Sequence, residues 1–207
     1  MAAHPSSARA ILIWAVLAAA LIVPVAVAAT SPLLAWREPV YIAAGFAGVV
    51  TLGLLLLQPL LAGGYLPGVS TRFARRLHAL VGGGLLVAVV VHVVGLWITS
   101  PPDVIDALLF RSPTPFSIWG VIAMWTVLAA ALFAAFRRRL RLRPAKWRLV
   151  HLTLSTVIIA GTVLHAMLIE GTMGLVSKAV ICALVVAALV KLLVDLQARN
   201  MLIRRKA

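Results

Sequence analysis

The chain has 207 residues, of which 63% are hydrophobic and only 12% are charged, and its net charge is +14. Soluble domains are about half apolar and about a quarter charged, so this composition excludes a soluble globular protein. The basic residues lie in short blocks between long apolar runs, which is typical of cytoplasmic loops and argues against a nucleic-acid partner. The single cysteine, Cys182, excludes an intrachain disulfide and a thiolate cluster.

Six apolar segments are long enough to cross a bilayer, which takes about 20 residues. In chain order they cover residues 10–29, 40–62, 77–98, 117–136, 149–169 and 174–195. The connections between them are short and contain Pro and Gly, so none can hold a folded domain outside the membrane. We therefore predict an all-α, polytopic membrane six-helix bundle that forms a single domain over residues 1–207.

The first segment has an alternative interpretation. Arg9, the apolar stretch and the sequence Ala26-Val27-Ala28 resemble a secretory signal with a cleavage site. The stretch is longer than a usual signal core, so we expect an uncleaved first span. Cleavage would remove one helix and leave the remaining topology unchanged.

The distribution of Lys and Arg predicts the orientation of the spans. Sixteen of these residues fall on one side of the six segments and three on the other. Cytoplasmic loops carry the excess of positive charge, so we expect both termini in the cytoplasm.

Four histidines lie inside the spans, where an ionisable side chain is costly and indicates function. His78 and His92 are on the third span, and His151 and His165 are on the fifth, 14 residues apart in each case. Fourteen residues of helix return to within about 40° of the same face and rise about 21 Å. Because the two spans run parallel, His78 lies level with His151, and His92 with His165. Two opposed imidazoles at two depths are what two six-coordinate haems require.

Other interpretations of the histidines stay open. A haem-free transporter could use them for protons or a metal, and they could also be structural. Zinc would need ligands clustered at one depth, and no Asp or Glu lies in the middle of a span to complete a proton relay.

Basic and aromatic side chains near the histidines add further expectations. Arg75 and Arg76 precede His78 within one turn, and Arg148 precedes His151. They are positioned to pair with the propionates of the haem nearer the cytoplasm, although orientation of the spans alone would also explain them. Trp125 is deeper in the fourth span, between the two helices that carry the histidines; it could contact a haem face, but we expect it to pack in the core.

These segments resemble the ferric-reductase-like transmembrane domain family, which includes the NADPH oxidases, the STEAP metalloreductases and the haem-binding subunit of a bacterial periplasmic methionine sulfoxide reductase system. The resemblance covers about residues 45–195 and rests on three segments: Arg75-Arg76-Leu77-His78 through His92, Trp119-Gly120, and Trp147-Arg148-Leu149-Val150-His151 through His165. It implies a six-helix haem-binding core in which His78, His92, His151 and His165 are the axial ligands of two b-type haems. In size the chain is similar to the stand-alone bacterial members of the inner membrane.

The resemblance also implies a function. Electrons would pass from a cytoplasmic flavin reductase or a quinol, with a flavin or quinone on the cytoplasmic side, to a periplasmic acceptor such as ferric iron or a partner oxidoreductase. The chain would be either an oxidoreductase itself or the electron-transfer subunit of one, embedded in membrane lipid.

Overall fold

The computed structural model describes the backbone of residues 7–204 and the side chains of residues 7–198, and the regular structure of that part is entirely helical. Six helices are long and apolar enough to cross a membrane. They are α1 (Ser7–Ala29), α2 (Pro39–Gly63), α3 (Thr71–Thr99), α5 (Ser117–Ala135), α7 (Pro144–Leu168) and α8 (Leu175–Arg204). Three short helices lie in the connections: η1 (Pro32–Leu34), α4 (Pro101–Leu108) and α6 (Arg137–Leu140). The predicted all-α bundle of six spans is confirmed.

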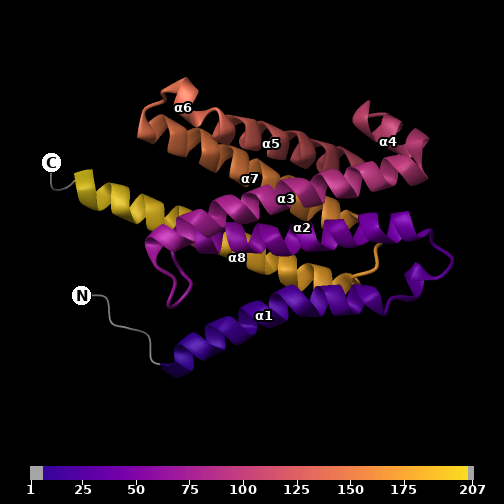
Figure 1. Cartoon of the computed structure of the whole chain (residues 1–207), viewed down its shortest axis with the longest axis horizontal. Helices are drawn as coiled ribbons and strands as arrows, with labels where there is room; N and C mark the ends of the chain where they lie inside the picture. The colour runs from indigo at the N-terminus through magenta and orange to yellow at the C-terminus, as the bar shows by residue number, and fades with distance from the viewer. Residues whose placement is uncertain (1–6, 205–207) are drawn as a thin grey trace.

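The long helices lie side by side, with α5 and α7 on one side of the bundle and α1 on the other (Figure 1). Helix α2 packs closely against α3, and α5 packs closely against α7, while α8 contacts α1, α2 and α7. On α7, Gly161 allows the close approach of α5, because a Cβ there would lie 3.0 Å from the Trp119 carbonyl oxygen. Helices α3 and α7 make few direct backbone contacts, so they face each other across a gap between the two helix pairs.

Helices α3 and α7 begin earlier than hydropathy predicts. Ser70 caps α3, since its hydroxyl accepts a hydrogen bond from the Phe73 amide at 3.3 Å. Pro144 occupies the first turn of α7, where its missing N–H costs nothing. The capped starts extend both helices into polar sequence, so Arg75, Arg76 and Arg148, which precede the apolar segments of residues 77–98 and 149–169, belong to the helices that carry the histidines.

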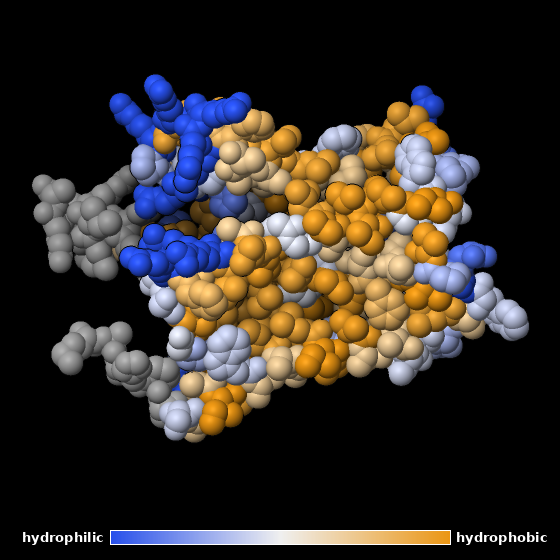
Figure 2. Space-filling model, in the orientation of Figure 1, coloured by the Kyte–Doolittle hydropathy of each residue, from blue (hydrophilic) through white to orange (hydrophobic). Residues whose placement is uncertain are grey.

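The surface is divided between apolar and basic side chains. Figure 2 shows a broad apolar band, with the most hydrophilic side chains gathered at the end where α1 begins and α8 ends. We call this end, which carries Arg72, Arg75 and Arg76 of α3 and the arginines of residues 137–148, the basic end, and the opposite end the far end. Trp125 is 56% exposed within the apolar band, so the expectation that it packs in the core is wrong. An outward apolar band is the surface that lipid covers.

Candidate functional site

The four predicted histidines form two facing pairs between α3 and α7. The ring centroids of His78 and His151, the basic-end pair, lie 6.1 Å apart, with the ring planes at 73°. Those of His92 and His165, the far-end pair, lie 6.4 Å apart at 80°. The structure therefore brings together the same two pairs that the 14-residue spacing predicts.

Backbone carbonyls of the neighbouring helices orient the far-end pair. The Nδ1 of His92 lies 2.7 Å from the Ala44 carbonyl oxygen of α2, and the Nδ1 of His165 lies 2.9 Å from the Phe116 carbonyl oxygen at the start of α5. Because only a protonated nitrogen can donate to a carbonyl, these bonds assign the proton of each ring to Nδ1. The lone pair is then on Nε2, which is the form of imidazole that binds a metal.

The basic-end pair is held differently. The Nδ1 of His78 donates to the Gln58 carbonyl at 3.2 Å, and the Gln58 side chain donates back to the His78 carbonyl at 3.4 Å. The Nδ1 of His151 is buried and has no hydrogen-bond partner within the part of the chain that the structure describes. Instead, the Trp147 ring stacks on the His151 ring with centroids 5.4 Å apart.

The separation within each pair suits a metal held on two opposite sides. A metal bound at about 2 Å from each of two opposed imidazole nitrogens places the ring centroids about 6 Å apart, which matches both pairs. Among the described residues, no group of three or more His, Cys, Asp or Glu side chains gathers around a point. A haem macrocycle supplies four ligands of its own, so it fits a site at which the chain supplies two histidines.

The surface between α3 and α7 is hollowed at the basic end (Figure 2). Leu85 and Ile158 are each seven residues from both histidines of their own helix, and both are buried. These apolar side chains lie midway between the two histidine levels. The two sites are therefore separate and do not join into one continuous channel.

The three predicted arginines are all exposed at the basic end. Arg75 and Arg148 each stand three residues before a histidine, about 60° around the helix from it. Arg76 stands two residues before His78 and therefore points about 160° away from it. Arg75 and Arg148 are thus matched candidates for an anionic group in the gap, and Arg76 is the poorer one.

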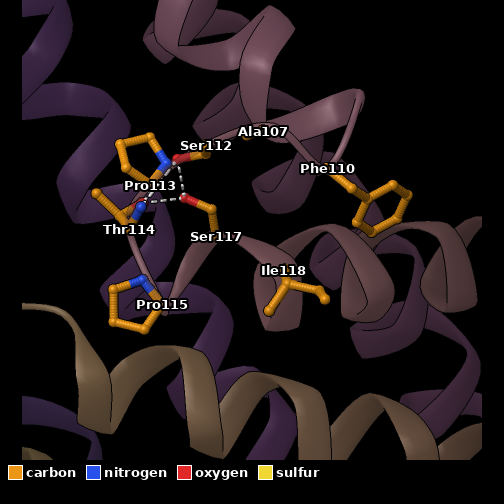
Figure 3. A pocket seen from close by; sticks show the side chains of 8 residues that line it. All are labelled: Ala107, Phe110, Ser112, Pro113, Thr114, Pro115, Ser117 and Ile118. Carbon is orange, nitrogen blue, oxygen red and sulfur yellow. Dashed lines mark hydrogen bonds between the residues drawn. The ribbon is translucent and has the colours of Figure 1, made fainter.

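Hydroxyl groups fix the chain segment that supports the far-end pair. The connection between α4 and α5 forms an open pocket of about 190 Å³, drawn in Figure 3, which Phe110 and Ile118 line on its apolar side. The Ser112 hydroxyl lies 2.8 Å from that of Thr114 and 3.1 Å from that of Ser117, and the latter two also bond to each other. These bonds brace the residues on both sides of Phe116, whose carbonyl receives His165.

Sequence reasoning missed the groups that orient the histidines. Ala44, Gln58 and Phe116 act through their backbone carbonyls, which leave no mark on residue type. It also missed Lys178, which is only 6% exposed and donates from Nζ to the Ile169 carbonyl at the end of α7. A lysine inside an apolar run was the available signal for it.

Comparison with known proteins agrees with this architecture. Residues 44–162 match the family described as ferric reductase like transmembrane component, a segment that covers more than half of the chain and includes three of the four histidines. His165 lies three residues beyond the matched segment. No curated protein and no solved structure matches the chain. The chain is a multi-pass membrane protein that belongs to the ferric-reductase-like transmembrane family, whose general function is to carry electrons across a membrane.

Proposed function

We propose that this protein is a two-haem b-type cytochrome that carries electrons through the membrane from its basic end to its far end. The observation that carries the proposal is the presence of two facing histidine pairs, with centroids 6.1 and 6.4 Å apart, at two depths between α3 and α7. His78 and His151 would hold one haem, and His92 and His165 the other. The family match supports electron transfer in general.

The residues of this chain have three tasks in the proposed mechanism. Haem iron, when bound, would supply the one-electron chemistry. Two imidazoles would hold each haem, an arrangement that favours electron transfer over binding of oxygen at the iron. The carbonyls of Ala44 and Phe116 keep the far-end imidazoles in the metal-binding form. Leu85 and Ile158 keep water out of the space between the levels.

The arginines of the basic end would bind the propionates of the nearer haem. Arg75 on α3 and Arg148 on α7 each lie about 60° around the helix from a histidine, and a guanidinium can bind a carboxylate through two parallel hydrogen bonds. Arg76 points away from His78 and would contribute charge alone. The basic end would face the cytoplasm, because cytoplasmic segments carry the excess of Lys and Arg.

The proposed donor is a cytoplasmic flavoprotein or a quinol, and the proposed acceptor is a periplasmic one, such as ferric iron or a partner oxidoreductase. The cluster of arginines at the basic end supports a donor with an acidic docking face, since opposite charges steer association. The placement in a bacterial inner membrane belongs to the same proposal.

A reduced-minus-oxidised absorption spectrum of the purified protein tests the proposal directly. We expect the absorption bands of a b-type haem and a content of two haems per chain. A preparation that contains all four histidines but takes up no haem, even when haem is supplied during expression, refutes the proposal and favours a haem-free transporter. Dithionite reduction followed by addition of ferric citrate then tests whether electrons leave the protein.

A further inference from the structure

The two histidine pairs differ in the hydrogen bonds that reach their Nδ1 atoms. Both imidazoles of the far-end pair donate short hydrogen bonds, of 2.7 Å from His92 and 2.9 Å from His165. In the basic-end pair, His78 makes a longer bond of 3.2 Å, and His151 has no partner within the described residues. The far-end imidazoles therefore donate two short hydrogen bonds to backbone carbonyls, whereas the basic-end pair donates one longer bond.

Each histidine of the far-end pair is oriented by a backbone carbonyl, and a glycine stands four residues after the residue that provides this carbonyl. A Cβ at Gly48, four residues after Ala44, would lie 3.1 Å from the His92 Nδ1. A Cβ at Gly120, four residues after Phe116, would lie only 2.7 Å from the His165 Nδ1. Glycine at these two positions lets each ring reach the carbonyl that would otherwise be shielded by a side chain.

The same arrangement is incomplete at the basic end. Fourteen residues after Ala44 and Phe116 stand Gln58 and Ala130, so their carbonyls occupy the equivalent positions on α2 and α5. The residue four positions after each of them is alanine rather than glycine. His78 reaches the Gln58 carbonyl only at 3.2 Å, and His151 packs against Trp147 instead. The guanidinium of Arg137 lies over the Trp147 ring, 4.8 Å from the centroid of that ring.

Hydrogen bonding at Nδ1 changes what the ring offers to a metal. An imidazole that donates its Nδ1 proton to a carbonyl is a more basic ligand, and a more basic ligand stabilises the oxidised metal more than the reduced one. We infer that the far-end pair holds its haem at a lower midpoint potential than the basic-end pair, an inference that rests on the proposed function. Gly48 and Gly120 are the positioning residues that create the difference.

The fixed charges also favour a lower midpoint potential at the far end than at the basic end. Positive charge near a haem favours the form that carries the extra electron, and Arg75, Arg137 and Arg148 all stand at the basic end. Three basic residues oppose this at the far end, Arg37, Arg111 and Lys178, but four carboxylates stand at the same end, Glu38, Asp103, Asp106 and Glu170. The Lys178 Nζ is also bonded to the Ile169 carbonyl at the negative end of the α7 helix dipole, which offsets part of its charge. With haem bound at both pairs, transfer from the basic end to the far end would thus be uphill, and the electron would rest at the basic end until the acceptor withdraws it.

Optical redox titration of the purified haem-loaded protein tests the inference. The His151→Ala variant leaves only the far-end pair intact, so its remaining haem identifies the far-end potential in the wild-type titration. We expect that potential to be the lower of the two. A far-end potential equal to or above the basic-end potential overturns the inference while leaving the two-haem function standing, whereas a protein without haem refutes both.

Substitution of the glycines tests the cause. In Gly120→Ala the new methyl group pushes the His165 ring off the Phe116 carbonyl, and we expect the far-end haem to become about tenfold easier to reduce, equal to about 59 mV for one electron. Gly48→Ala should raise the same potential by a smaller amount. If Gly120→Ala fails to retain the far-end haem, Gly48→Ala tests whether these glycines set the far-end potential. Gly45→Ala is the control, because no atom lies within 4 Å of a Cβ built there. A far-end potential that Gly48→Ala leaves unchanged, or a shift that Gly45→Ala reproduces, overturns the role of the glycines.

Discussion

Replacing His165 with alanine asks whether the two histidine pairs act as separate sites. The change leaves His92 as the single imidazole at the far end, where the two rings now lie 6.4 Å apart. His151 is 14 residues away on the same helix, which places it about 21 Å along the axis. Substitutions separated by more than about 10 Å act independently, so the basic-end pair should not respond. We expect bound haem to fall from two per chain to one, with the remaining haem unchanged in spectrum and potential.

The assay is the haem content of the purified protein, from its pyridine haemochrome absorbance, divided by the protein concentration from amino-acid analysis. Leu164→Ala is the matched control, since Leu164 is the adjacent residue and is 39% exposed, and it should retain both haems. His151→Ala should give the reciprocal result and lose the basic-end haem. If His165→Ala loses both haems although its circular dichroism shows an intact helical bundle, the level-by-level pairing is wrong. If it keeps both, His165 is not a ligand.

Three further substitutions test the surroundings of the pairs. Arg75→Gln should lower the midpoint potential of the basic-end haem by the equivalent of up to about 1 kcal/mol, since the guanidinium is exposed and screened. Arg76→Gln is its control in the same redox titration, and an equal effect of both would show that only net charge matters. Leu85→Ala should destabilise the bundle by about 2–5 kcal/mol, because it opens a cavity between the levels. Its unfolding in increasing dodecyl sulfate, compared with wild type, measures this, and an unchanged midpoint would contradict the burial. Gly161→Leu should weaken the packing of α5 on α7, because its side chain would meet Trp119 and Ala123. Thermal unfolding in detergent checks it, and wild-type stability would count against that contact.

The six spans could be predicted from sequence because crossing a bilayer sets a length and an apolar composition that few other structures require. The starts of α3 and α7 could not, since a helix continues wherever its backbone bonds and caps allow. Ser70 and Pro144 extend these helices beyond the apolar residues. That extension gives Arg75 and Arg76 different directions relative to His78, which the apolar pattern by itself does not show. The outward position of Trp125 likewise depends on which face of α5 meets α7.

The sequence by itself determined the spacing of the histidines and therefore their division into two levels, because helix geometry converts 14 residues into one face and a fixed rise. Helix direction then followed from the number of spans between α3 and α7. Only the tertiary structure decided how each imidazole is held. The partners are backbone carbonyls of Ala44, Gln58 and Phe116, and every residue carries the same carbonyl. Which carbonyl reaches a ring depends on how closely α2 and α5 approach, and this contact leaves the Nδ1 of His151 unlike the other three.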